Sequence, residues 1–424
     1  MSDEHDDEPR GEPLAHNRRL FLGLSAAGLA SAVLSGCSSS PGGGAQPASM
    51  GSGAMGAMSS GGSAAAMPGM AMPGDWPPMP EGAPTSDAEY QSIDIDVQIA
   101  EHEIVPGFSI HTLAFNGAVP GPVIRAQQGQ WMKVRFQNRT DLNHTIHWHG
   151  LTVPYAMDGV PFVTQPPVMP GQEYIYRFRA EPYGTHFYHC HWGTVLHMQS
   201  GMYGAFIVES PDDPILATHG YEREYTLVFS AVDTNFMRTE LNNMLQRMTR
   251  RMRLMADGRL DSWTSSHFDT LDDMLAAMER GFVPPYMRSR RARAGLPNPD
   301  FFTINGKSYP ATEPLRIRRG EKIRVRLANA GTVEHYLHLH GHDFLQVCDD
   351  GAPLPQPITM NTVRLSPGKT ADIIIEGTNP GIWTFHDHDT RRVTNNGMYP
   401  GGALTVLAYD GFQSSFTPSI ALDE

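Results

Sequence analysis

The chain has 424 residues, of which 40% are hydrophobic and 18% charged, and its formal net charge is −13. This length is enough for two or three domains that each bury a core. The acidic balance argues against nucleic acid as a partner. Nineteen histidines stand beside only three cysteines, Cys37, Cys190 and Cys348, whose odd number and wide spacing argue against a disulfide framework.

The first 37 residues have the features of an export signal. Arg18 and Arg19 precede Phe21-Leu22 and a short apolar run, a pattern that resembles a twin-arginine signal. The run is rich in Gly, Ala and Ser, which favours a cleaved signal over a membrane-spanning helix. "LSGC" resembles a lipoprotein cleavage box that would make Cys37 a lipidated first residue, and ordinary cleavage nearby is the alternative. We expect a periplasmic or cell-surface protein that contacts the membrane through this lipid alone.

Residues 38–85 are dominated by Gly, Ser, Ala, Pro and Met. Such a segment cannot bury a core, so we expect a flexible tether. Its methionine thioethers are soft ligands suited to cuprous ion. A low-complexity spacer without metal is the alternative interpretation.

An internal repeat predicts the architecture. "VIRAQQGQWMKVRFQNRTDLNHTIHWHG" from Val123 matches "PLRIRRGEKIRVRLANAGTVEHYLHLHG" from Pro314 at an offset of 191 residues. Both copies read as alternating strands separated by Gly, Pro and Asn. The chain is therefore predicted to be all-β, with two homologous sandwich or Greek-key barrel domains at residues 86–212 and 222–410.

Residues 235–299 interrupt the second domain with helical spacing. Met244, Met248, Met252 and Met255 share one face of the predicted helix. Such a stripe is typical of helix packing, and a metal store is the alternative.

"YHCHWGTVLHMQSGM" places a cysteine between two histidines. On a strand, residues two apart share a face, so Cys190 points away from His189 and His191. By the same rule His144 faces away from His147 and His149. Cys190 and His144, with His197 and Met202 from the following loop, make the donor set of a blue-copper electron-transfer site.

Four His-x-His pairs lie symmetrically in the two repeats. They are His147 and His149, His189 and His191, His338 and His340, and His386 and His388. Neutral imidazole suits copper, so eight such rings predict a second centre with three ions. His186 and His342 lie beside these motifs without fitting a ligand position, and we expect structural roles for them.

"HTIHWHG", "HYLHLHG" and "YHCHWGTVLHMQSGM" resemble the copper motifs of the multicopper oxidase family, over residues 95–410. The resemblance implies cupredoxin-like domains and about four copper ions per chain: one type 1 ion at the Cys190 set and a type 2/type 3 trinuclear cluster at the eight paired histidines. It also implies that His147 and His338 bind the type 2 ion, and the other six the type 3 pair. Asp158, in "MDGVPF", resembles a family acid that delivers protons, and a turn-forming Asp-Gly is the alternative.

The second domain departs from the type 1 pattern. Asp387 replaces the cysteine, and the downstream histidine position falls near Val393 or Thr394, while His335 and Met398 remain as apparent relics. Type 1 copper is therefore expected in the first domain only, as in a two-domain laccase-like oxidase. The resemblance implies a homotrimer, with each cluster between the first domain of one subunit and the second of the next.

These features predict oxidation of phenols, aromatic amines or metal ions, coupled to reduction of dioxygen to water. Electrons would pass from Cys190 to the cluster through His189 and His191. A copper nitrite reductase is the nearest alternative, but that family keeps one catalytic copper with three histidines and loses most His-x-His pairs. A copper-sequestering or electron-carrier lipoprotein is a further alternative, for which an intact cluster would be superfluous.

Overall fold

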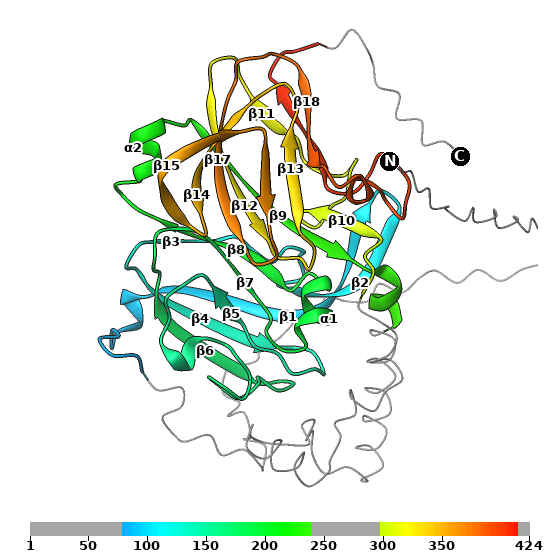
Figure 1. Ribbon diagram of the computed structural model, residues 1–424. Helices are drawn as coiled ribbons and strands as arrows, with labels where there is room; N and C mark the ends of the chain where they lie inside the picture. The colour runs from blue at the N-terminus through cyan, green and yellow to red at the C-terminus, as the bar shows by residue number, and fades with distance from the viewer. Residues whose placement is uncertain (1–78, 240–296, 414–424) are drawn as a thin grey trace, which may run out of the picture. The chain divides into compact units, whose positions relative to one another are not determined.

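The computed structural model describes residues 79–239 and 297–413, and within them the expected all-β architecture is confirmed (Figure 1). The export signal, Cys37, almost all of the tether and the methionine stripe lie outside the described residues, as does most of the predicted insertion. The helices named among the described residues are short: η1 (Asp87–Glu89), η2 (Tyr155–Met157), α1 (Thr194–Gln199), α2 (Pro214–His219) and η4 (Thr390–Val393). None of the helices in this part of the chain is long and apolar enough to cross a membrane.

Strands β1 to β8 form a sandwich that we call domain 1. One sheet has the order β2 (Phe108–Phe115), β1 (Gln91–Val105), β4 (Trp131–Asn138), β6 (Glu173–Arg179). The other has the order β3 (Ile124–Gln127), β8 (Tyr203–Glu209), β7 (Gly184–His189), β5 (His147–His149). Alternation along β4 buries Met132, Val134 and Phe136 between the sheets.

Strands β9 to β19 form a second sandwich, domain 2. Its larger sheet has the order β10 (Phe301–Ile304), β9 (Arg223–Val232), β12 (Lys322–Asn329), β17 (Thr370–Glu376), β14 (Phe344–Asp349), β15 (Ala352–Met360). The smaller sheet has the order β11 (Leu315–Ile317), β19 (Leu404–Tyr409), β18 (Ile382–Asp387), β13 (His335–Leu339), β16 (Thr362–Leu365). Each sandwich has its own apolar core, as expected for two separate domains.

The repeat seen in the sequence is also a repeat in structure. β4 and β12 begin 191 residues apart, and each pairs in parallel with the first strand of its domain, β1 or β9. Asn138 ends β4 and its side-chain amide donates to the Val168 carbonyl at 2.9 Å; Asn329 ends β12 and donates to the Leu365 carbonyl at 2.9 Å. In both domains this amide fixes the loop that leads to the first histidine of the motif.

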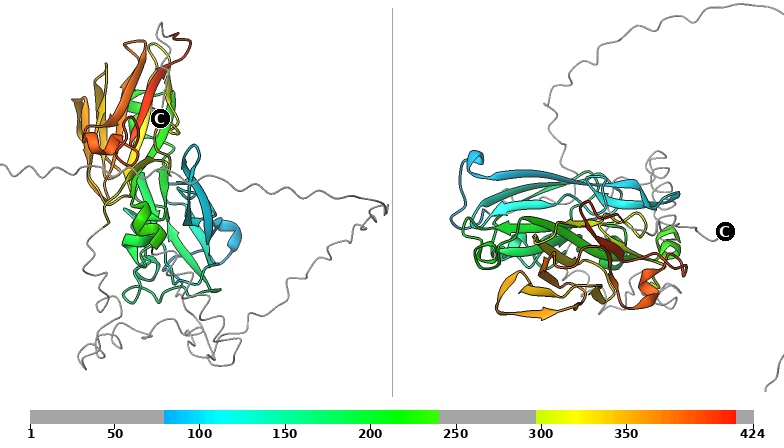
Figure 2. Two further views of the ribbon diagram at one scale, coloured as in Figure 1. Left: turned by 90° about the vertical axis from the view of Figure 1, so that its right-hand side faces the viewer. Right: turned by 90° about the horizontal axis from the view of Figure 1, so that it is seen from above.

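β7 and β8 lie between two apolar layers. Tyr188 and Phe206 belong to the domain 1 core, whereas Phe187 and Tyr203 pack with Val228 and other domain 2 residues. In the right-hand view of Figure 2, green strands of this region lie between the cyan strands of the first sheet and the yellow-to-orange strands of domain 2. Every residue of β7 is consequently buried.

Candidate metal centres

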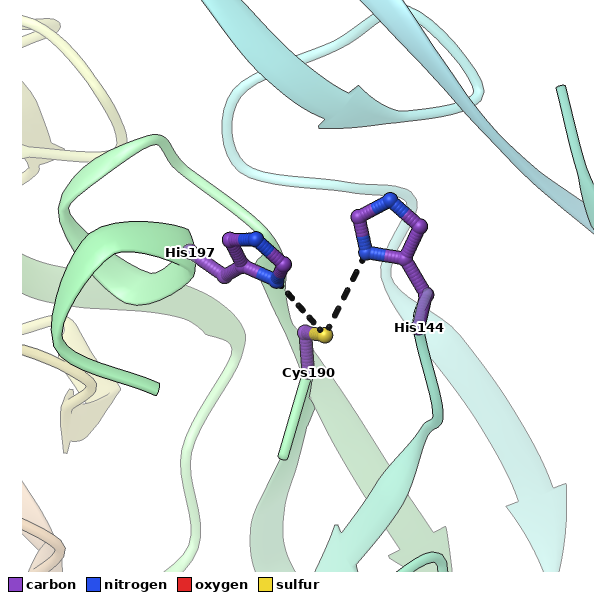
Figure 3. Close-up of side chains that lie close together, drawn as sticks. All are labelled: His144, Cys190 and His197. Atoms are coloured by element: carbon purple, nitrogen blue, oxygen red, sulfur yellow. Dashed lines mark hydrogen bonds between the residues drawn. The ribbon is translucent and has the colours of Figure 1, made fainter. Parts of the chain in front are cut away.

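Cys190 directly follows β7 and lies between two imidazoles (Figure 3). Its Sγ is 3.2 Å from His197 Nδ1 and 3.6 Å from His144 Nδ1. All three residues are buried, and so is Met202, whose carbonyl oxygen accepts from the Cys190 amide at 3.0 Å. The structure therefore brings together three of the residues that the sequence assigned to one centre, with the Nδ1 atoms of both imidazoles near the sulfur, and places the Met202 main chain beside Cys190.

The tautomer of His144 is set by a chain of hydrogen bonds. Thr140 Oγ1 donates its proton to Asn138 Oδ1 at 2.9 Å, so it accepts from His144 Nε2 at 2.7 Å. The His144 proton then resides on Nε2, and the Nδ1 lone pair faces Cys190. Backbone bonds between His144 and Val168 hold the residue in place from the other side. Sequence reasoning missed Thr140, and only its position two residues after the repeated Asn138 could have indicated it.

The electrostatics of this pocket suit a soft metal ion. Burial lowers the pKa of His197 to about 3 and holds the pKa of His144 well below its usual value, so both rings are neutral. Burial also raises the pKa of the Cys190 thiol to about 12. A thiolate in this pocket therefore needs a cation beside it, and a sulfur with two imidazoles fits copper.

Histidines on β5, on β7 and just after β7 form a second donor set. His147 pairs with His189 across the two strands, and the ligand atoms of His147, His149 and His189 all lie within 4.8 Å of one another. The ring of His191 is 5.5 Å from that of His147. We call these four residues the domain 1 histidine set. The pKa of His189 is lowered to about 3 and that of His149 to about 4, chiefly by burial, so these rings are neutral.

Domain 2 assembles the other four histidines in the same way. His338 pairs with His386 across β13 and β18, and Nε2 of His340 is 3.0 Å from Nε2 of His386. The ring of His388 is 5.4 Å from that of His338. We call these four residues the domain 2 histidine set. Among the described residues, the two groups whose ligand atoms all lie within 4.8 Å of one another both belong to domain 1.

Asp158 contacts the domain 1 histidine set. Its carbonyl oxygen lies 2.8 Å from His147 Nδ1, and its carboxylate oxygen Oδ1 lies 3.3 Å from the same nitrogen. It ends η2 and is followed by Gly159, whose φ is +80°, so it also occupies a turn. The acid and turn interpretations of Asp158 are therefore structurally compatible, and its main chain orients His147.

Domain 2 has an ion pair where domain 1 has the cysteine centre. Asp387 Oδ2 lies 2.7 Å from His335 Nδ1, and Nη1 of Arg392 approaches the same oxygen at 3.5 Å. His335 and Asp387 are fully buried, whereas Met398 is 66% exposed and does not line this pair. The residues present do not fit a blue-copper centre, because a guanidinium stands beside a carboxylate and no thiol is present.

The two extra histidines have hydrogen-bonding partners of their own. His342 Nε2 bonds to the Tyr409 hydroxyl at 2.7 Å, and His186 Nε2 bonds to the Pro182 carbonyl at 3.0 Å. Neither belongs to the donor groups described above.

Comparison with known proteins identifies the family. Residues 97–213 and 282–400 each match a sequence profile described as multicopper oxidase. The chain belongs to the multicopper oxidase family. The blue copper oxidase of Nitrosomonas europaea is 32% identical, with a TM-score of 0.59 over 75% of this chain and 85% of that one. The multicopper oxidase mgLAC is 31% identical, with a TM-score of 0.61 over 77% of this chain and 89% of that one.

A longer relative is also similar to this multicopper oxidase. Copper resistance protein A of Escherichia coli is 26% identical over 302 residues, which are 68% of this chain and 47% of that protein. The chain spans about half the length of the curated relatives it matches first. Membership of the family implies copper, and the Cys190 pocket has the donor chemistry to hold it.

Proposed function

We propose that this multicopper oxidase is a two-domain, laccase-like enzyme. It removes one electron at a time from a phenol, aromatic amine or metal ion at a type 1 copper held by His144, Cys190, His197 and Met202. The electrons reduce dioxygen to water at a trinuclear cluster held by the eight paired histidines. When bound, the copper ions supply the one-electron redox chemistry. The observation that carries this proposal is that Cys190 directly follows β7 and meets His144 and His197, while its neighbour His189 meets His147 and His149.

The chain itself provides the connection between the two centres. His189 and His191 are the sequence neighbours of Cys190, so a few covalent bonds of the backbone separate its sulfur from either ring. The buried surroundings of β7 exclude water and fix these side chains. Asp158 holds His147 by its carbonyl and presents its carboxylate beside the same ring, where it can transfer protons.

We further propose that the cluster forms between subunits of a homotrimer. The domain 1 set supplies four imidazoles and the domain 2 set four more, and the rings of each set lie close together within their own domain. Domain 1 (residues 86–212) of one subunit would face domain 2 (residues 222–410) of the next. Sedimentation at several protein concentrations tests this, and a monomer that retains full cluster copper would contradict it.

Copper counting and two turnover assays test the activity. We expect about four copper ions per chain and consumption of dioxygen with a phenolic substrate. About two copper ions per chain with nitrite turnover would instead support a nitrite reductase. Copper binding without either turnover would support a carrier or sequestering protein.

Cuprous ion is a substrate candidate that the similarity to Copper resistance protein A favours. The methionine-rich residues 38–85 would then collect the ion, and the twin-arginine signal with lipidated Cys37 would place the enzyme outside the cytoplasm. Deleting residues 40–80 should lower cuprous oxidation relative to phenol oxidation. An unchanged ratio of the two rates would contradict this role of the tether.

A further inference from the structure

One face of β7 contacts domain 2 of the same chain at Gly184, Thr185 and Phe187. Alternation puts Thr185, Phe187 and His189 on this face, while Tyr188 and Cys190 point into the domain 1 core. Domain 2 therefore fixes β7, the strand that leads into Cys190, on the face opposite the domain 1 core.

Thr185 is held by three hydrogen bonds from domain 2. Its hydroxyl donates to Asp372 Oδ1 at 2.7 Å and accepts from Arg326 Nη1 at 2.8 Å. Its carbonyl accepts from the Thr370 hydroxyl at 2.8 Å. All four residues are buried, and Asp372 also binds Arg324, so this is a charged network enclosed between the domains. Burial opposes ionisation of Asp372, yet Arg324 and Arg326 hold its pKa below the usual value.

Gly184 brings the two backbones together at the start of β7. Its φ is +132°, and a Cβ there would lie 2.1 Å from the Gly351 carbonyl oxygen. A backbone approach this close leaves little freedom for the strand to shift against domain 2.

Phe187 packs against domain 2 and also against two histidines of the domain 1 set. Its ring packs in the cluster that contains Val228 and Ala328 of domain 2. The same ring stacks on His149, with centroids 4.3 Å apart and planes 20° apart, and lies 5.6 Å from the His189 ring at 27°. The Phe187 ring, which domain 2 holds in place, therefore packs against the rings of two candidate ligands, His149 and His189.

We propose that Thr185 and Phe187 are positioning residues through which domain 2 orients His149 and His189 of its own chain. Neither residue touches a ligand atom of the Cys190 centre, which lies on the other face of the strand. In the proposed trimer, domain 2 would thus serve two clusters: it supplies its own histidine set to one and holds the domain 1 set of its own chain for another. The inference rests on the proposed function, because it assigns His149 and His189 to the cluster.

Two variants test this in the full chain loaded with copper. Thr185→Val removes both hydroxyl bonds at nearly constant volume, and Phe187→Leu removes the ring but keeps the site apolar. Partners that orient metal ligands typically change metal affinity by 10- to 100-fold, so cluster copper should be lost at about tenfold lower chelator concentration than in the wild type. The visible absorption of the type 1 copper should remain. The proposal would be overturned if a variant retained cluster copper as well as the wild type does, or if it lost type 1 and cluster copper to the same extent.

Matched variants separate positioning from general destabilisation. Thr185→Ser keeps the hydroxyl and should restore wild-type copper retention. Glu321→Gln disrupts another charged network of domain 2, in which buried Glu321 binds the more exposed Arg223 and Arg318. Phe136→Leu removes a ring from the domain 1 core. Both should lower the melting temperature without selective loss of cluster copper. A selective loss in either one would overturn the proposal.

Hydrogen exchange of the metal-free protein makes the test independent of copper. Backbone amides of residues 184–191 should exchange faster in Thr185→Val than in the wild type or in Glu321→Gln. Unchanged exchange would overturn the positioning role. If the wild-type chain bound no cluster copper, the proposed function would fail, while faster exchange in Thr185→Val would still show that domain 2 positions β7.

Discussion

His335 Nδ1 lies 2.7 Å from Asp387 Oδ2 in domain 2, at the repeat positions where His144 and Cys190 meet in domain 1. The position of Thr140 is occupied by Gly331, whose amide keeps the backbone bond to Asn329 but offers no hydroxyl. Nε2 of His335 accordingly has no hydrogen-bond partner among residues 79–239 and 297–413. The second domain has kept the pairing of these two positions and replaced the soft sulfur by a carboxylate.

We predict that Asp387 stabilises the metal-free protein. Its carboxylate accepts hydrogen bonds from His335 Nδ1 and the Asp389 amide and lies beside Arg392, so Asp387→Ala leaves buried groups unpaired. Removing one member of such a buried pair costs about 3 kcal/mol of unfolding free energy. Denaturant unfolding measures this, with Asp389→Ala as the control, for which loss of a helix cap costs about 1 kcal/mol. Equal effects of the two variants would contradict the prediction.

Cys190→Ser should remove the type 1 copper and leave the cluster copper in place. A hydroxyl is a poor substitute for a thiolate toward copper, whereas the domain 1 histidine set lies on the other face of the strand. Visible absorption and copper counting check the outcome together. Persistence of the blue colour would show that Cys190 is not the sulfur ligand.

Thr140→Val should weaken the type 1 centre selectively. The variant removes the acceptor that keeps the His144 proton on Nε2, and loss of such partners lowers metal affinity by about 10-fold or more. Chelator titration followed at the type 1 absorption band measures the change. Ser308→Ala is a suitable control, because it loses a buried hydroxyl bond to the Phe302 carbonyl away from either centre. Identical behaviour of the two variants would refute the tautomer argument.

Asp158→Asn should slow dioxygen reduction without loss of copper. The main-chain carbonyl that holds His147 is unchanged, while the amide cannot donate and accept protons as a carboxyl group does. Loss of a general acid typically slows a reaction by about 100-fold. Stopped-flow reduction of the type 1 copper should stay at the wild-type rate while turnover falls. Unchanged turnover would favour the purely turn-forming role.

Acid should abolish the stability contributed by Glu321. Arg223 holds the pKa of this carboxyl at about 2, below its ordinary value of 4.5. A lowered carboxyl pKa stabilises the fold fully above the ordinary value, and that contribution is lost as pH falls toward the folded value. Glu321→Gln should therefore cost about 2 kcal/mol near pH 6 and almost nothing near pH 2. A constant difference across this range would contradict the assignment, and surface Glu173→Gln should show little effect at either pH.

The sequence by itself determined the donors and the faces they occupy. The side-chain period of a strand is a local property of the backbone, so the letters around Cys190 already separate its sulfur from His189 and His191. The 191-residue repeat likewise predicted two sandwiches, and Asp387 in place of cysteine predicted a single blue centre.

Only the tertiary structure decided which distant residues support those donors. Val168 paired with His144, Asp372 bound to Thr185, and Phe187 between domain 2 and His149 all arise from segments that meet through packing. Residues far apart in sequence are brought together by the burial of apolar surface, which no local periodicity encodes. The candidate ligands can therefore be found along the chain, whereas many of the contacts that orient them exist only once distant segments have packed together.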